Sequence, residues 1–224
     1  MEKKNGWKQW ICAVAAILTL SLMVSVVPPM TAEANEPALR LLKPQTDSQP
    51  FLKLLAKRES SRSFSPKPLS DQTLSNLLWA AFGINRPESG KRTAPTANNK
   101  QEMDVYVVME KGIYLYDAEA NVLKRVVPGD HRGIMGSQSF VKDAPLNLVY
   151  VADFAKSGAR SNEDKLLYAA AATGFISENV YLYCASADLA TVVRASVDRR
   201  ALAEIMKLTP SQKIILAQTV GYPK

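Results

Sequence analysis

The hydrophobic pattern after residue 50 begins with two short helices. Five of the six residues from 51 to 56 are apolar, which predicts a short amphipathic helix over 50–58. Over residues 74–82 apolar side chains recur at helical spacing, with Ser70 in the N-cap position and Gly83 as the stop. The pattern therefore predicts two helices joined by a polar, serine-rich segment.

Strand-like patterns follow in the middle of the chain. Apolar and β-branched residues at 105–108 and 113–116 flank a turn that contains Gly112, which predicts a hairpin. Residues 122–127 form a further candidate strand. The run LNLVYVA at 146–152 is continuously apolar, as is typical of a central strand.

The second half of the chain alternates between helix-like and strand-like hydrophobic spacing. Residues 162–187 form the longest helical segment, which is rich in alanine and has apolar residues on most sides, so we expect a central buried helix. A strand over 191–197, a short helix over 199–207 and a last strand over 214–220 complete the order. This mixture of helices and strands predicts an α+β fold.

Two polar stretches interrupt the pattern. Residues 84–102 contain almost no large apolar groups, and a structureless stretch of that length inside a domain is usually functional or disordered. Residues 130–142 are also polar, and we expect a short helix at most within them.

The N-terminal part of the chain reads as a secretory leader over 1–34. Three lysines precede an apolar run over 11–27, and Ala-Glu-Ala at 32–34 predicts cleavage before Asn35. The apolar run reaches the lower limit for a membrane span, so an uncleaved anchor is the alternative. The leader predicts export, to the periplasm or the cell exterior, with no stable membrane contact once it is removed.

The remaining chain divides into an exposed lead-in over 35–49, which is polar and contains proline, and one domain over 50–224. After cleavage it keeps one cysteine, Cys184, which is predicted to be buried in the alanine-rich helix. His131 is the only histidine of the chain. Metal sites built on His or Cys clusters and Ser-His or Cys-His catalysis are therefore disfavoured, and an enzyme with this inventory would take its chemistry from a cofactor.

The net charge adds little to these predictions of function. The chain carries 28 Lys and Arg against 21 Asp and Glu, a formal net charge of +7. The basic residues are scattered, and no basic stretch alternates with aromatic residues, so nucleic-acid binding is not indicated. A moderately basic protein does suit an anionic ligand.

Two polar loops have the composition of a ligand site. The segment KRESSRSF at 57–64 places arginines and serines together, which suits a phosphate, although a solvated loop has the same composition. The segment KRTAPTANNKQ at 91–101 offers amide side chains that can bind the edge of a planar heterocycle. A nucleotide or flavin mononucleotide (FMN) has both parts. The chain contains neither a Gly-x-Gly-x-x-Gly nor a Walker A sequence.

Taken in order, several motifs resemble the nitroreductase-like flavoproteins, and most closely the branch that includes azoline-oxidising dehydrogenases. The motifs are RESSRSF at 58–64 with PLS at 68–70, PTANNKQ at 95–101, AP before LNLVYVAD at 144–153, GFISENVYL at 174–182 and VGYP at 220–223. The resemblance covers nearly all of 50–224. It implies a central mixed or antiparallel sheet flanked by helices around a long buried helix.

The resemblance also implies a homodimer that binds FMN in two interface clefts. Hydride would pass from NAD(P)H, or another donor, to a nitroaromatic, quinone or related small acceptor by ping-pong chemistry. Arg58 and Ser60 would hold the phosphate and ribityl chain, and Arg62 would lie near the pyrimidine N1 and O2. No side chain need act as a catalytic acid or base, and no metal is implied.

The other residues implied by the resemblance lie later in the chain. Gln138 would face the pyrimidine edge, and the backbone at Ala195 and Ser196 would face flavin N5. Four residues would approach from the partner subunit, namely Pro95, Thr96, Ala97 and Asn99.

Three positions depart from the family pattern. Glu178 stands where the helix motif usually has glutamine, and Ala195-Ser196 stands where many members have two glycines. Lys224 is all that corresponds to the usual C-terminal basic pair that holds the phosphate. Two other functions are therefore considered: a flavin- or nucleotide-binding protein without turnover, and an interaction protein that has lost the cofactor.

Overall fold

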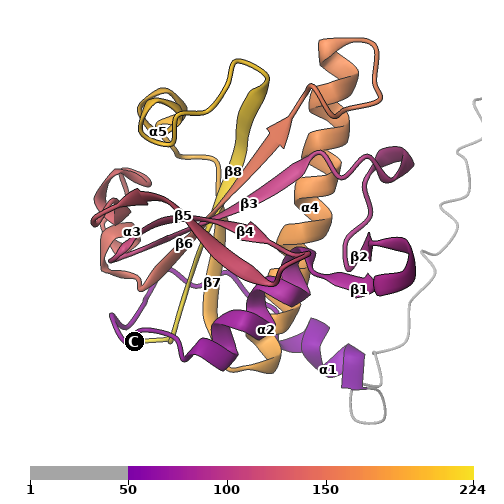
Figure 1. Cartoon of the computed structure of the whole chain (residues 1–224). Helices are drawn as coiled ribbons and strands as arrows, with labels where there is room; N and C mark the ends of the chain where they lie inside the picture. The colour runs from indigo at the N-terminus through magenta and orange to yellow at the C-terminus, as the bar shows by residue number, and fades with distance from the viewer. Residues whose placement is uncertain (1–49) are drawn as a thin grey trace, which may run out of the picture. The chain divides into compact units, whose positions relative to one another are not determined.

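The computed structural model describes residues 50–224, so the predicted leader over 1–34 and lead-in over 35–49 lie outside the described residues. At the centre is a six-stranded sheet in the order β5-β4-β3-β6-β8-β7, and all neighbouring strands are antiparallel (Figure 1). The strands are β3 (Met103–Met109), β4 (Gly112–Asp117), β5 (Val122–Pro128), β6 (Leu146–Asp153), β7 (Ala190–Arg194) and β8 (Gln212–Gly221).

Helices cover both faces of the sheet (Figure 1). On one face lie α1 (Pro50–Lys57), α2 (Asp71–Phe82) and α4 (Asn162–Ser186), and on the other lie α3 (Phe140–Asp143) and α5 (Arg199–Ile205). Because successive strand residues point to opposite faces, Val105 and Val107 of β3 pack toward α2 and α4, whereas Tyr106 and Val108 pack toward α5. This arrangement confirms the predicted α+β fold.

Local signals placed α2 correctly. The side chain of Ser70 accepts a hydrogen bond from the backbone N–H of Thr73 at 3.1 Å, and Gly83 follows the last turn. A side chain at Gly83 would collide with Trp79, so a residue without Cβ is required where the chain leaves the helix.

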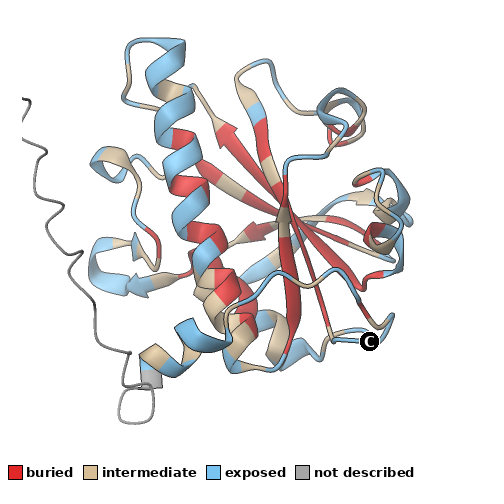
Figure 2. Ribbon diagram, turned by 180° about the vertical axis from the view of Figure 1, so that it is seen from behind, coloured by how far each residue is buried: buried red, intermediate tan, exposed pale blue. Residues whose placement is uncertain are grey.

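Helix α4 is not buried on most sides as expected: it buries one face and exposes the other, where Leu167 and Phe175 lie (Figure 2). Ser161 caps its first turn by accepting from the backbone N–H of Asp164 at 3.0 Å. Small residues such as Ala169 and Ala172, together with Ile176, are buried against the sheet. Within residues 50–224, none of the helices is long and apolar enough to cross a membrane.

The polar stretch 84–102 is more ordered than expected. It contains β1 (Ile84–Arg86) and β2 (Lys91–Arg92), which pair with each other, and two 3-10 turns, η1 (Pro87–Ser89) and η2 (Ala97–Asn99). Arg92 organises the stretch in place of a hydrophobic core. Its guanidinium donates to the Gln101 side chain at 2.7 Å and to the Phe82 carbonyl at 2.8 Å, and it lies over the Phe82 ring.

The expected strand over 191–197 was too long, because β7 ends at Arg194. Beyond that point the guanidinium of Arg199 donates to the carbonyls of Ile214 and Ile215 at 3.1 and 2.8 Å. A side chain thus satisfies the edge of β8 that the backbone of β7 would otherwise pair with. The polar stretch 130–142 forms η3 (Arg132–Ile134) and the four-residue helix α3.

Cys184 should resist alkylation in the folded protein. It is buried, as predicted, and burial raises the pKa of its thiol to about 12 from an ordinary value of 9.0. At pH 8.5 we expect iodoacetamide to modify Cys184 at least ~100-fold more slowly in buffer than in urea, because reaction requires local opening. Peptide mass mapping separates Cys184 from Cys12, and equal rates in both solvents would contradict this burial.

Candidate functional site

The arginine- and serine-containing segment lies along the open edge of the sheet, beside β7. The backbone N–H of Ser61 donates to the Thr191 carbonyl at 2.9 Å. Further on, Phe64 forms an isolated bridge with Pro223, and the N–H of Ser65 donates to the Tyr222 carbonyl at 2.9 Å. The segment is therefore fixed to β7 and to the C-terminal end of β8 rather than being a free loop.

Tyr181 of α4 connects this segment to the sheet. Its hydroxyl lies 2.9 Å from the hydroxyl of Ser60 and accepts a hydrogen bond from the backbone N–H of Val193 at 2.9 Å. The guanidinium carbon of Arg58 lies 5.4 Å from the centre of the Tyr181 ring, within the range of a cation–π contact. Sequence reasoning did not assign Tyr181 a role, and its place in the GFISENVYL motif was the available signal.

Arg58 and Arg62 have no carboxylate partner among the described residues. Arg58 is half-buried and Arg62 is exposed, and within residues 50–224 neither takes part in an ion pair. With the Ser60 hydroxyl between them in sequence, they leave two cationic donors and a neutral one available to an anionic ligand.

A second segment reaches the same strand from the other direction. The hydroxyls of Ser137 and Ser196 lie 3.3 Å apart, which joins the loop before α3 to the residues that follow β7. The side-chain oxygen of Gln138 is buried and has no hydrogen-bond partner among the described residues. A buried acceptor without a donor is costly, so this atom is suited to an N–H group of a ligand.

Arg194, the last residue of β7, holds the loop before α3 to the residues that follow β7. It is buried, and its guanidinium donates to the carbonyls of Met135 and Ser196 at 2.9 and 3.2 Å. It also donates to the side chains of Asn147 and Thr219 at 3.1 and 3.0 Å. All four acceptors are neutral, and burial lowers the pKa of Arg194 to about 10.

Gly136 is matched to this guanidinium, because a Cβ at that position would collide with it. Sequence reasoning missed Arg194 as well. An arginine directly after the apolar residues of β7 was its only signal, and its acceptors lie up to 59 residues away.

The loop that contains Pro95, Thr96, Ala97 and Asn99 has its own supports. The Thr96 hydroxyl accepts from the Gln101 backbone N–H at 2.9 Å, and Asn99 adopts a positive φ of 53°. In the described part of the chain, no hydrogen bond joins this loop to residues 58–62 or 195–196. Its approach to a flavin from the partner subunit stays a prediction.

Lys224 lies near Phe64 and Arg132. It lines a cavity of about 350 Å³ together with Phe64, Lys142 and Arg132, and Arg132 is paired with Asp130 at 2.7 Å. No hydrogen bond or ion pair within residues 50–224 connects Lys224 to Arg58 or Ser60. A phosphate contact by Lys224 stays a prediction.

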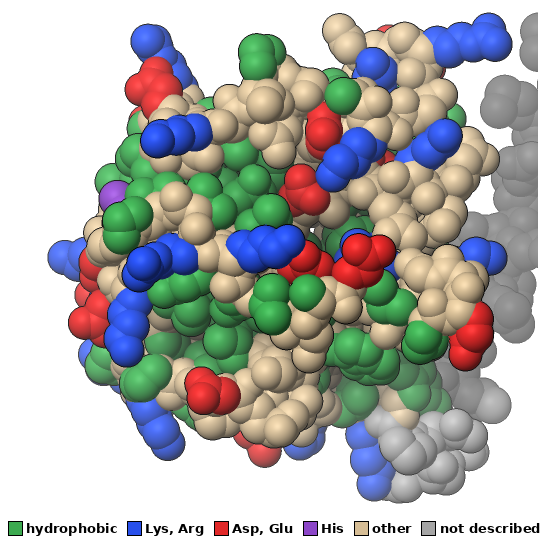
Figure 3. All heavy atoms as spheres, viewed as in Figure 1, with side chains coloured by type: hydrophobic (Ala, Val, Ile, Leu, Met, Phe, Trp, Pro, Cys, Tyr) green, Lys and Arg blue, Asp and Glu red, His purple; other side chains and the backbone are tan. Residues whose placement is uncertain are grey.

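Charges on the face of the molecule drawn in Figure 3 are mixed in sign, with basic and acidic side chains interspersed. The described residues contain no group of three His, Cys, Asp or Glu side chains that could hold a metal ion. The segment beside β7 offers two arginines and a serine, and the loop before α3 offers an amide oxygen that has no partner among the described residues. Such side chains suit the binding of an anionic ligand.

Comparison with known proteins agrees with this interpretation. Residues 55–222 match the family model described as the Nitroreductase family. A crystal structure of a protein of Ralstonia eutropha, assigned as a nitroreductase, is 42% identical, with a TM-score of 0.75 over 82% of this chain and 88% of that one.

Two more distant structures share the fold. A chain of the E. coli microcin synthetase McbBCD complex is 19% identical, with a TM-score of 0.66 over 83% of this chain and 75% of that one. The NADPH:FMN oxidoreductase from Vibrio harveyi, solved with NAD+, is 18% identical, with a TM-score of 0.58 over 78% of this chain and 69% of that one.

Proposed function

The chain belongs to the nitroreductase family, and on that premise we propose that it is an FMN-dependent oxidoreductase. Its donor would be NAD(P)H or another reductant, and its acceptor a nitroaromatic, a quinone or a related small molecule, used in turn by ping-pong chemistry. The observation that carries the proposal is the meeting of two segments beside β7. Ser60 is linked to Val193 of β7 through the Tyr181 hydroxyl, and the Ser137 hydroxyl, next to Gln138 in the chain, lies 3.3 Å from that of Ser196.

The residues at this edge fit the parts of FMN. Arg58 and Ser60 would bind the phosphate and ribityl chain, and the unpaired oxygen of Gln138 would accept the N–H of the pyrimidine ring. Arg62 would supply a fixed positive charge beside N1 and O2, where negative charge develops on reduction. The backbone at 195–196, held by Arg194, would offer N–H groups to N5. FMN itself supplies the hydride and electron transfer.

The similar proteins support different parts of this proposal. The Vibrio harveyi enzyme is by its name an FMN oxidoreductase that uses NADPH, which supports both the cofactor and a nicotinamide donor. The likeness to a McbBCD chain supports the azoline dehydrogenase-like branch that the motifs indicate. Both proteins are distant, so the acceptor of this chain is proposed only as a class.

A redox titration tests the proposal. The full chain loaded with FMN should lose its visible flavin colour under NADH or NADPH without oxygen, and regain it when menadione or nitrofurazone is added. A flavin that only dithionite reduces, and that neither acceptor reoxidises, would favour a binding protein without turnover. A folded chain that binds no flavin would favour an interaction protein that has lost the cofactor.

We also propose that the protein is a homodimer, because the exposed face of the α1, α2 and α4 layer is apolar. Apart from Leu166, which lines a cavity, the large apolar side chains exposed on these helices are Phe51, Leu55, Trp79, Leu167, Tyr168 and Phe175. Apolar surface of this extent is characteristic of a protein–protein interface. In a homodimer each chain would present its Pro95–Asn99 loop to the partner's site.

Leu167→Asp should therefore convert a dimer to a monomer, because a carboxylate would be buried in the apolar interface. Leu167 is 62% exposed in the single chain. Val126→Asp on β5, at a residue that is 40% exposed, is the matched control and should leave the dimer intact. Analytical ultracentrifugation measures the mass. A monomeric wild-type protein, or equal masses for both variants, would contradict this interface.

Finally, we propose that residues 1–34 direct export. Expression in a bacterial host should give a protein outside the cytoplasm whose N-terminus is Asn35. A chain that keeps residues 11–27 and sediments with membranes would instead establish the anchor. A full-length chain in the cytoplasmic fraction would contradict export altogether.

A further inference from the structure

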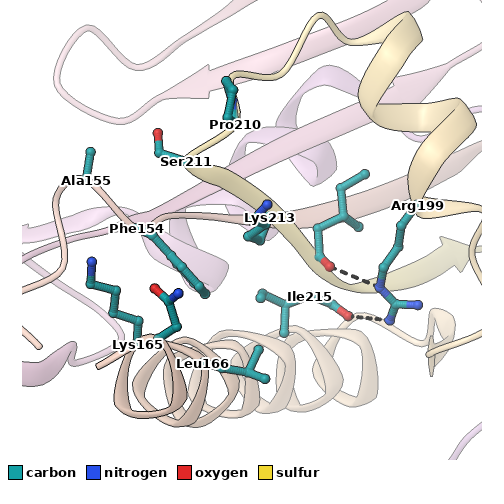
Figure 4. Close-up of a pocket in the computed structure, with 11 residues that line it drawn as sticks. Phe154, Ala155, Lys165, Leu166, Arg199, Pro210, Ser211, Lys213 and Ile215 are labelled. Atoms are coloured by element: carbon teal, nitrogen blue, oxygen red, sulfur yellow. Dashed lines mark hydrogen bonds between the residues drawn. The ribbon is translucent and has the colours of Figure 1, made fainter. Parts of the chain in front are cut away.

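A second cavity lies beyond the end of β7, where β8 becomes the edge of the sheet. It has a volume of about 730 Å³ and is bounded by the first turns of α4, the first half of β8, the end of β6 and the start of α5 (Figure 4). This volume is within the range of small-molecule sites. Neither residues 58–62 nor Gln138, which are proposed to bind FMN, line this cavity.

The inner wall of this cavity is apolar. Phe154, the residue that follows β6, Leu166 from α4 and Ile215 from β8 face a common space (Figure 4). Leu166 is 53% exposed although it lies on a cavity wall, so apolar surface remains uncovered there. A ligand with a flat apolar body would bury this surface.

Three cations surround the apolar wall. Lys165, Lys213 and Arg199 all line the cavity, and none of the lining side chains is acidic. Within residues 50–224 none of the three takes part in an ion pair. The acidic Asp153 lies close by, where its carboxylate accepts from the Ser211 hydroxyl at 2.9 Å and the Ala155 N–H at 3.0 Å, and within residues 50–224 it forms no ion pair with these cations.

Arg199 is held in place by acceptors that carry no charge. Its bonds to the carbonyls of Ile214 and Ile215 are joined by a third, at 3.3 Å, to the carbonyl of Ala195 (Figure 4 shows the first two). Carbonyl acceptors fix the guanidinium but do not neutralise it. Through Ala195, the cavity adjoins the segment assigned to flavin N5.

We propose that this cavity binds a small aromatic carboxylate, with the ring on Phe154, Leu166 and Ile215 and the carboxylate among the three cations. Resting on the proposed function, this ligand is the electron acceptor. If the aromatic ring of this ligand is a quinone, it would take up two electrons and two protons, as a hydride originating from NAD(P)H and a proton from solvent. A nitro group would do the same and lose one oxygen as water.

The test compares 4-nitrobenzoate with 4-nitrobenzyl alcohol, which has the same ring without the charge. Calorimetry on the flavin-free full chain should show tighter binding of the acid. In a K165Q/K213Q double variant the affinity for 4-nitrobenzoate should fall at least ~10-fold, since two positive charges close to the carboxylate are lost, while the affinity for the alcohol should not change. Lys111→Gln, on the β3–β4 turn outside the cavity, is the matched control.

Three results would overturn the proposal: equal binding of acid and alcohol, an equal loss in Lys111→Gln, or displacement of 4-nitrobenzoate by FMN. The last result would make the cavity part of the flavin site. In the FMN-loaded enzyme the double variant should raise KM for 4-nitrobenzoate at unchanged kcat. A chain that binds 4-nitrobenzoate but retains no flavin would refute the oxidoreductase function and leave the carboxylate site standing.

Discussion

Replacing the buried Arg194 with methionine should lower the free energy of unfolding by about 3 kcal/mol. Methionine fills much of the same volume, so the loss would come from hydrogen bonds rather than from a cavity. The carbonyls of Met135 and Ser196 and the side chains of Asn147 and Thr219 would lose their shared donor. The desolvation cost of the buried guanidinium opposes this effect, but the stranded acceptors outweigh it.

Urea unfolding of the flavin-free protein measures this change. Arg200→Met is the control, because Arg200 is exposed and its pair with Glu204 lies on the surface, so we expect a change within about 0.5 kcal/mol. Arg194→Lys should fall between the two, since an ammonium group reaches fewer of the four acceptors. Equal midpoints for Arg194→Met and Arg200→Met would show that the network does not support the fold.

Replacing Arg58 with alanine should strongly weaken the binding of FMN. A guanidinium on a phosphate contributes charge-assisted hydrogen bonds of about 1.5–3 kcal/mol, which corresponds to a ~10- to 100-fold weaker affinity when they are lost. The fold should remain, because the contact of Arg58 with the Tyr181 ring is its only described interaction through the guanidinium. Fluorescence titration with FMN gives the affinity of each variant.

Lys57→Ala is the matched control for Arg58→Ala. Lys57 is the preceding residue, carries the same charge, and is paired on the surface with Asp188 at 3.5 Å. Its removal should change FMN affinity less than ~3-fold. Arg58→Lys should lie between the two, because it keeps the charge and loses the bidentate geometry. Equal FMN affinity in Lys57→Ala and Arg58→Ala would remove Arg58 from the site.

Sequence predicted best those elements whose signals are local. Helix α2 was placed within a residue because Ser70 and Gly83 mark its two ends. Hairpin β3–β4 was found because its strands are adjacent in the chain. The order of 84–102 was not predictable in this way, since Arg92 reaches across to Phe82 and Gln101 to hold it. The end of β7 depends similarly on Arg199.

The residues of the candidate site also differ in whether a local sequence signal marks them. Arg58 and Ser60 belong to a short motif, so sequence alone singled them out. Tyr181, which lies 2.9 Å from the Ser60 hydroxyl, is 121 residues away in the chain. Arg194 looks like the end of an ordinary strand until the fold brings Met135 and Asn147 to it. The proposed ligand-binding residues Arg58 and Ser60 belong to a recognisable motif, whereas Arg194 belongs to none.

The visible absorption spectrum of the full chain, supplied with FMN and then desalted, tests the central claim most directly. We predict that a flavin band persists at about one FMN per chain, because in the proposed site Arg58, Ser60 and Gln138 would hold the cofactor. A protein that is folded by circular dichroism but colourless would contradict that claim, and the proposed oxidoreductase function would fall with it.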